Sequence, residues 1–345
     1  MIDALRDAGL LHKEVDSHSA TAAPWFLKVL HAFSGWMASF FLLLTLGAMI
    51  GKLFQTPPMM FGGGLFLIVT AYLMLTNKNK TLFLEHVSLS ASLAGQILIT
   101  LALFQWLGHD SFHHPEPWFG LAVLELILMG IMSDYLHRVF SAGVFAFALL
   151  YSMHLLGAGA ITVPLLLGAV VWLWLHEYAD PQAIFTRQPI SWGLSLTLLG
   201  SAASGHRVDP FWNATQHNTL GLDHPWIGAL GSGMVLIYLV YVMTKEMELS
   251  QAYRVMTLIF VALLALVSAK MPGLSVAVTL LVVGFSRGNL LLMGLSITTL
   301  IWATGSFYYA LHTTLLIKSA LLVASGLLLL VLYAVFHHST QREDS

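Results

Sequence analysis

The sequence predicts an all-α, polytopic integral membrane protein, a helical bundle with about twelve transmembrane helices. Two observations predict this class. Of the 345 residues, 57% are hydrophobic and 9% are charged, whereas a soluble domain carries about 25% charged residues. The apolar residues also fall in repeated runs of the length that crosses a bilayer, which is about 20 residues. A chain so poor in charge cannot cover itself with a polar surface, so lipid must be its solvent.

Twelve candidate spans follow one another along the chain. Short breaks that contain Pro, Gly, Asn or charged residues separate them. The spans are Val29–Ile50, Met59–Thr76, Val87–Leu107, Trp118–Met132, Val139–Leu156, Ala160–Leu175, Ile190–Ser204, Trp226–Met243, Val255–Ala269, Pro272–Phe285, Leu290–Ala310 and Thr313–Phe336. The ninth and tenth spans are short, and a re-entrant hairpin is the alternative for this pair.

Three parts of the chain can be separated by composition. Residues 1–28 are polar at first and mixed in charge, residues 29–336 form the transmembrane domain, and residues 337–345 are a short polar tail. The first 23 residues lack the basic start, short apolar core and cleavage site of a signal peptide. We therefore expect the first span to act as the insertion signal. No loop is long enough to form a soluble domain.

The distribution of Lys and Arg predicts the orientation, because cytoplasmic segments of membrane proteins are enriched in these residues. With the N-terminus inside, the outer loops hold three such residues and the inner segments hold eleven. The outer residues are Lys52, Arg207 and Lys270; the inner ones are Arg6, Lys13, Lys28, Lys78, Lys80, Arg138, Arg187, Lys245, Arg254, Arg287 and Arg342. We therefore predict that both termini are cytoplasmic.

Several function classes find no support in the sequence. The chain has no cysteine, which excludes disulfides, thiolate metal sites and cysteine nucleophiles. A net charge of −2 gives no indication of a nucleic-acid partner. The His-Glu-x-x-His and Gly-x-Ser-x-Gly patterns of metalloproteases and hydrolases are also missing. We expect no catalytic residue and no cofactor, and the lipid bilayer is the first expected partner.

Two charged residues within predicted spans are the first candidates for function. Glu125 lies about eight residues from the outer end of the fourth span, and Lys318 about six from that of the twelfth. The two depths match within one helical turn, so an ion pair is geometrically feasible. Such a pair can serve as a proton or ion relay, or it can simply fix the register of two helices. His154 and His312 could join this group.

Histidines in the outer loops are the second group of candidates. One loop contains His109, His113 and His114, and another contains His217 and His224. Imidazole and carboxylate ligands suit zinc, copper or nickel, so a periplasmic divalent-metal site is one interpretation. Solvated polar loops are the alternative, because the spacing of these residues is irregular. In both loops a His-Pro pair stands shortly before a Trp, which is typical of a helix start at the membrane interface or of an internal duplication.

A resemblance to a known family rests mainly on the C-terminal part of the chain. Residues 307–319 read Phe-Tyr-Tyr-Ala-Leu-His-Thr-Thr-Leu-Leu-Ile-Lys-Ser, and Gly326 and a leucine run follow. This pattern, and the opening stretch from Pro24 to Trp36, resemble the uncharacterised bacterial membrane family called domain of unknown function 4401. The resemblance implies an inner-membrane protein of about twelve helices with a small partner membrane protein. It also implies that Tyr309, Thr314 and Lys318 belong to a recurring motif.

Three functions compete at this point. A transporter or channel component is favoured by the many spans and by Glu125 and Lys318. A non-transporting subunit or sensor that acts with a partner membrane protein is the alternative, with the histidine-rich loops sampling the periplasm. A membrane-embedded enzyme is the least expected of the three, because no group of catalytic residues is recognisable.

Overall fold

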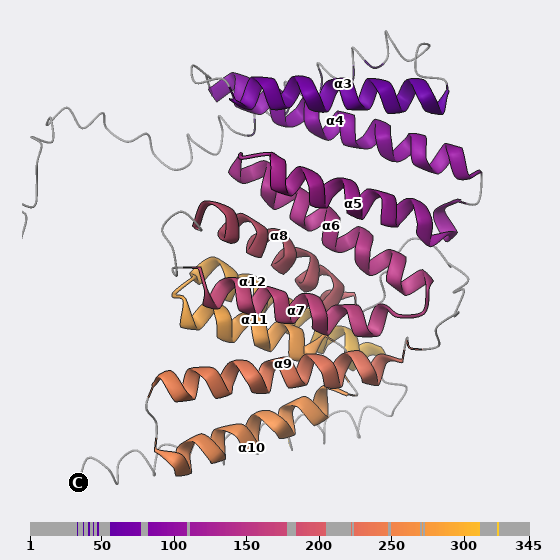
Figure 1. Cartoon of the computed structure of the whole chain (residues 1–345). Helices are drawn as coiled ribbons and strands as arrows, with labels where there is room; N and C mark the ends of the chain where they lie inside the picture. The colour runs from indigo at the N-terminus through magenta and orange to yellow at the C-terminus, as the bar shows by residue number, and fades with distance from the viewer. Residues whose placement is uncertain are drawn as a thin grey trace, which may run out of the picture. The chain divides into compact units, whose positions relative to one another are not determined.

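Figure 1 shows a computed structural model of the chain. It describes residues 56–76, 82–108, 111–177, 184–204, 222, 224–247, 250–269, 271 and 273–310, and the single positions 33, 37, 41, 44, 47 and 323. These residues form helices and connecting turns, without a strand. The helices are α3 (Pro57–Thr76), α4 (Leu82–Leu107), η1 (Ser111–His113), α5 (Pro115–Ile131), α6 (Tyr135–Leu155), α7 (Gly159–Leu175), α8 (Ile184–Ala203), α9 (Pro225–Glu246), α10 (Gln251–Ser268), α11 (Leu274–Ser286) and α12 (Leu290–Ala310).

The all-α class is confirmed, and the described helices are consistent with a membrane helical bundle. The second to eleventh predicted spans each coincide with one of the helices α3 to α12. Among the described residues, five helices are long and apolar enough to cross a membrane: α3, α4, α6, α9 and α12. The first and twelfth predicted spans lie outside the described residues except for single helical positions such as Phe33 and Val323. The number of twelve transmembrane helices therefore stays a prediction.

Most helices begin a few residues before the predicted spans, and the difference is largest for α8. The predicted span starts at Ile190, after a proline, but α8 begins at Ile184 and contains Pro189 in its second turn. A proline inside a helix has no N–H for the carbonyl four residues before it, here that of Phe185. Arg138 Nη1 donates a hydrogen bond of 2.9 Å to this carbonyl. The arginine thus replaces the missing donor, and the helix can continue through Pro189.

The chain divides into two compact units, residues 1–102 and 103–345. In the first unit, α3 and α4 cross at two glycines. A Cβ atom on Gly64 would lie 2.6 Å from the carbonyl oxygen of Gly95, and the reverse distance is the same. Only glycine permits such a close approach of two backbones, which is the usual way for helices to associate in a membrane.

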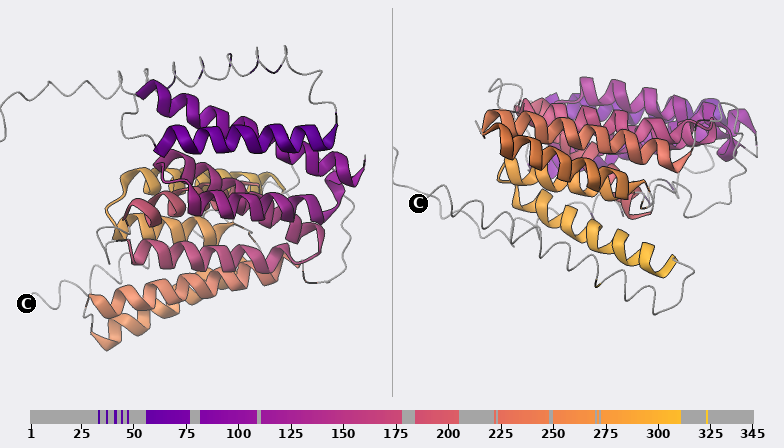
Figure 2. Two further views of the ribbon diagram at one scale, coloured as in Figure 1. Left: turned by 45° about the horizontal axis from the view of Figure 1, so that its top comes forward. Right: turned by 90° about the horizontal axis from the view of Figure 1, so that it is seen from below.

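The second unit contains two layers of helices. In Figure 1, α5, α6, α8, α7, α9 and α10 follow one another side by side in this order, and the neighbours in this row are in contact. The second layer consists of α11 and α12, which contact α7, α8 and α9 (Figure 2). The 13 residues of α11 are covered largely by these neighbours, with Val276, Leu280 and Val283 fully buried.

The centre of the second unit is α7, whose sequence is apolar on every face. A helix that is apolar all round is typical of burial within a protein or a membrane. Its residues Leu167, Val170 and Trp174 are at most 1% exposed. They belong to a core to which α6, α8, α9, α11 and α12 also contribute. Because α7 shares this core with all five of these helices, their turns surround its two ends.

Positive charge gathers at one end of the second unit, which we call the basic end. Consecutive helices run in opposite directions (Figure 1), so alternate turns share one end. The described Lys and Arg residues of this unit all lie in or next to the turns α5–α6, α7–α8, α9–α10 and α11–α12. They are Arg138, Arg187, Lys245, Arg254 and Arg287. The opposite end carries the helix starts at Gly159, Pro225 and Leu274.

The closest helix crossing of the second unit is that of α6 and α8. A Cβ atom on Gly193 would overlap the carbonyl oxygen of Val139 and lie 2.8 Å from the backbone nitrogen of Gly143. Thr197 adds a hydrogen bond of 2.9 Å to the carbonyl of Gly143. The two backbones thus meet without intervening side chains, and the crossing depends on glycine.

We expect Gly193→Ala to destabilise the protein by about 1–3 kcal/mol, the usual cost of overpacking, because the new methyl group meets backbone atoms that cannot move aside. Thermal unfolding in detergent, followed by circular dichroism, measures this effect. Gly200→Ala on the same helix is the matched control, since a Cβ there has nothing within 4 Å. Equal melting temperatures for the two variants would contradict the proposed tight crossing.

Candidate functional site

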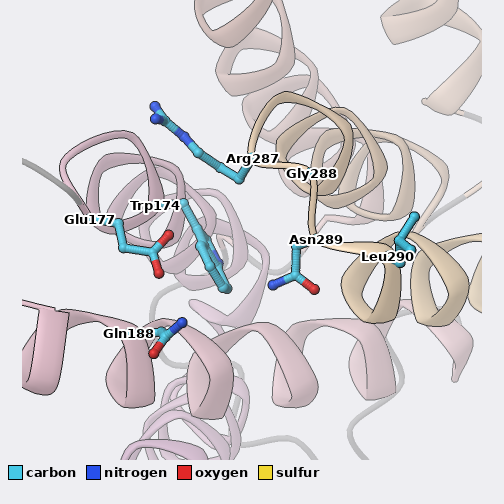
Figure 3. A pocket seen from close by; sticks show the side chains of 7 residues that line it. All are labelled: Trp174, Glu177, Gln188, Arg287, Gly288, Asn289 and Leu290. Carbon is cyan, nitrogen blue, oxygen red and sulfur yellow. The ribbon is translucent and has the colours of Figure 1, made fainter. Parts of the chain in front are cut away.

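A pocket opens at the basic end, where the turn after α7 meets the turn between α11 and α12. Its volume is about 360 Å³. The lining residues are Trp174, Glu177, Gln188, Arg287, Gly288, Asn289 and Leu290. Figure 3 shows that the carboxylate of Glu177, the indole of Trp174 and the amide of Asn289 lie around the same space. The residues come from α7, α8, the α11–α12 turn and the start of α12, so the pocket depends on their packing.

Glu177 is the buried charge of this pocket. It follows the last turn of α7, and only 2% of its surface is exposed. Burial raises the pKa of the Glu177 carboxyl above its usual value of 4.5, while the charge of Arg287 and a hydrogen bond from Gln188 act in the opposite direction. Among the described residues, no basic group forms an ion pair with Glu177 within 4 Å. The carboxylate is therefore stabilised by the charge of Arg287 beyond ion-pair distance and by the amide of Gln188.

Two arginines hold the C-terminal end of α7 in place. The last carbonyls of a helix have no partner within the helix. Arg287 Nη2 donates to the Leu175 carbonyl at 3.0 Å, and Arg187 Nη1 donates to the His176 carbonyl at 2.6 Å. Arg187 also lies over the ring of Trp172, 5.6 Å from its centre. Because positive charge is favourable at this end of a helix, both contacts stabilise α7.

Trp174 and Asn289 are fixed by contacts outside the cavity. Trp174 Nε1 donates to Ser195 Oγ at 3.2 Å, and its ring meets the ring of Trp192 edge-on at 5.7 Å. Asn289 Oδ1 accepts the Leu292 N–H at 3.1 Å and so caps the start of α12. The side chains therefore keep their positions without a ligand.

A second site of interest surrounds Glu125, which the sequence predicts as an intramembrane carboxyl. Glu125 lies within α5 and is fully buried, at 0% exposure. Neither of its carboxyl oxygens forms a hydrogen bond of good geometry with a described residue. The Ser141 hydroxyl on α6 is the polar group near enough to stabilise the carboxylate. A carboxylate at such a position is costly unless it is protonated, paired or hydrated.

Polar and aromatic residues lie on opposite sides of Glu125. Toward the basic end, Ser141 Oγ is 3.3 Å from His137 Nδ1, and both residues are at most 1% exposed. His137 stands in the first turn of α6, where Asp134 caps the helix by accepting its backbone N–H. Toward the other end, Trp118 of α5 packs against Phe104, Phe147 and Tyr151. Within the described ranges, the carboxyl thus has polar neighbours toward the basic end and aromatic neighbours toward the other end.

Comparison with protein families identifies the family of the chain. Residues 24–339 match the model of the family described as Domain of unknown function (DUF4401). The chain belongs to the DUF4401 family. The match covers nearly the whole sequence, and it confirms the resemblance seen in the C-terminal stretch. No curated protein and no solved structure matches the chain.

In this DUF4401 protein, the predicted ion pair between Glu125 and Lys318 stays a prediction. Glu125 is placed in α5, but Lys318 lies outside the described residues, as do His312 and Thr314. His154 lies in the last turn of α6, close to the end opposite the basic end. The structure thus places Glu125 and His154 at different depths.

Metal binding by the outer histidines likewise stays a prediction. His113 lies in η1, and His114 and His224 are the N-cap residues of α5 and α9, each followed by a proline in the first turn. His109 and His217 lie outside the described residues. In the described ranges, no three His, Asp or Glu side chains come together as metal ligands would. Both His-Pro motifs do begin a helix, as the interface interpretation expects.

Sequence reasoning missed the pocket of this DUF4401 protein. Glu177, Gln188 and Asn289 come from three separate segments, the turn after α7, α8 and the α11–α12 turn, and none stands in a recognisable motif. One signal was present: Glu177 is an acidic residue two positions after the apolar run that ends in Trp172-Leu173-Trp174-Leu175. The arginines of these turns were counted for orientation, but their hydrogen bonds to helix carbonyls depend on tertiary structure.

The raised pKa of Glu177 gives a test by stability. A carboxyl whose pKa is higher in the folded than in the unfolded protein binds more protons when folded. Stability should therefore fall as the pH rises from about 4.5 through the folded pKa. We expect Glu177→Gln to remove this loss and to be as stable as the native protein, or more so, at pH 8. Melting temperatures in detergent from pH 4.5 to 8 measure the difference.

Glu246→Gln is the control for this series, because Glu246 is an exposed carboxyl at the same end. Its melting temperatures should follow those of the native protein. A Glu177→Gln variant that loses stability steadily as the pH rises, as the native protein does, would contradict the burial argument.

Proposed function

We propose that this DUF4401 protein is a transport component of a bacterial inner membrane and that it conducts protons by way of Glu125. The observation that carries the proposal is the fully buried carboxyl of Glu125 within α5, which corresponds to the fourth predicted span. Its oxygens make no hydrogen bond of good geometry with the described residues. Ionisable residues within membrane helices are rare and commonly mark ion or proton pathways. Few structural roles require a carboxyl in such a place.

The polar connection toward the basic end supports this proposal. Ser141 and His137 continue from Glu125 along α6, and His137 lies one helical turn nearer to the basic end than Ser141. Hydroxyl and imidazole groups can both accept and donate a proton. Asp134, at the start of α6, is partly exposed and is the natural point of exchange with water. The aromatic group around Trp118 would act as the barrier on the other side.

The alternative is a non-transporting subunit that acts with a small partner membrane protein. One observation favours it: Glu125 is completely enclosed by protein, with 0% of its surface exposed. In that case the carboxyl would set the register of the helices, and protons would not pass. The two functions differ in proton flux, which can be measured directly.

Proton flux into proteoliposomes tests the transport proposal. Vesicles that contain the purified protein and an internal pH-sensitive dye are given an inward-driving potassium diffusion potential with valinomycin. We expect their internal pH to fall faster than that of protein-free vesicles. Glu125→Gln should reduce the protein-dependent rate at least tenfold, because the amide cannot exchange a proton.

Glu116→Gln provides the matched control, since Glu116 is an exposed carboxyl in the first turn of the same helix. It should leave the rate unchanged. Vesicles with the native protein that are as tight as empty vesicles would overturn proton conduction and leave the structural subunit as the function.

The proposed orientation places the basic end and both termini in the cytoplasm. It is supported by the gathering of Arg138, Arg187, Lys245, Arg254 and Arg287 at one end. We expect a green fluorescent protein fused to the C-terminus to fluoresce in cells, and an alkaline phosphatase fused at the same point to be inactive. Active phosphatase with a dark fluorescent protein would reverse the orientation.

A further inference from the structure

We propose that the pocket at the basic end binds a small organic ammonium ion. The inference goes beyond proton conduction, because it concerns a different group of residues and is tested by binding alone. It combines three features of the pocket: an acidic wall, an aromatic wall and an amide donor, of which the last two are held in place from outside the cavity. None of these residues is needed for the connection from Glu125 to the basic end.

The acidic wall is Glu177. Its carboxylate faces the cavity beside Trp174 and Gln188 (Figure 3), although the residue as a whole is only 2% exposed. No basic side chain of the described residues comes within 4 Å of it. Buried charges are usually paired, so a cation in the pocket would supply the missing partner.

Arg287 does not occupy the place of that cation. Its guanidinium points away from the cavity in Figure 3 and is tied to the Leu175 carbonyl. The negative charge of Glu177 is thus directed to the cavity, while the positive charge of Arg287 serves the end of α7.

The aromatic wall is Trp174. Its ring cannot turn away, because Nε1 is bonded to Ser195 and the ring edge packs against Trp192. A tryptophan ring beside a carboxylate is a favourable environment for an alkylated ammonium ion, which gains from both the charge and the π-face. A hydrated metal ion would gain only from the charge. The pair therefore favours an organic cation over an inorganic one.

The amide donor is Asn289. Its Oδ1 is occupied by the cap of α12, and its Nδ2 points toward Trp174 in Figure 3. This N–H group can bind a hydroxyl or carbonyl oxygen on a ligand that also carries the ammonium group. Gly288 and Leu290 form an exposed rim, with Leu290 80% exposed, so the pocket is open at the basic end. About 360 Å³ is ample for an ion of this size.

Isothermal titration calorimetry of the purified full-length protein at pH 8 tests the proposal, with tetramethylammonium chloride as the probe and sodium chloride as the ionic-strength blank. The native protein should bind the probe with saturation. Glu177→Gln should weaken binding at least tenfold, because it removes the counter-charge. Glu246→Gln, which removes an exposed carboxyl at the same end, should leave binding unchanged.

Asn289→Asp gives a second and opposite arm. Aspartate can still cap α12 through the same oxygen, but it brings a second negative charge to the pocket. Binding of tetramethylammonium should become at least threefold tighter. If the Glu177→Gln variant does not remain monodisperse in detergent, the affinity of the Asn289→Asp variant for tetramethylammonium tests the proposal instead.

Three results would overturn the proposal. The first is the absence of saturable heat with the native protein up to 50 mM probe. The second is binding that neither Glu177→Gln nor Asn289→Asp alters, which would place the ion elsewhere. The third is saturable binding of glucose and not of tetramethylammonium, which would mean that the pocket binds a neutral polyol.

Discussion

The arrangement of this protein depends on one constraint: within a membrane, every backbone carbonyl must find a partner inside the protein. At the basic end, three arginines meet this requirement. Arg138 serves the carbonyl that Pro189 leaves without a donor, and Arg187 and Arg287 serve the last carbonyls of the α7 region. These contacts join the turns of α5–α6, α7–α8 and α11–α12. The basic-end pocket exists because those turns are held together.

Small residues meet the second requirement, which is close packing without a hydrophobic driving force between helices. Gly193 lets α8 lie directly on α6, and Gly231 lets α9 approach Pro164 of α7. Both contacts join the helices of the second unit through backbone and small side chains.

The positions of helices α3 to α12 could be predicted from the sequence, but the contacts between their turns could not. Hydrophobic runs of span length predicted α3 to α12 because transfer into lipid depends on composition alone. The predicted span starts at Ile190, whereas α8 starts at Ile184. The sequence does not reveal that Arg138, from another turn, supplies the donor that lets the helix pass through Pro189. Glu125 was recognisable, since a carboxyl within an apolar run stands out. Glu177 was not, because its significance comes from Gln188 and Asn289, which are distant in the sequence and meet it only in the fold.

The arginines at the basic end bind neutral carbonyls, and none of the three forms an ion pair within 4 Å with a described carboxylate. Their positive charge is consequently not cancelled by the contacts that position them. In the proposed orientation, moving such a charge outward against a resting membrane potential costs about 2.3 kcal/mol for each 100 mV. Three charges that are fixed to the folded backbone must move together or not at all. With the basic end in the cytoplasm, the contacts that complete the helix ends would therefore also oppose reversal of the inserted protein, and more strongly at a higher membrane potential.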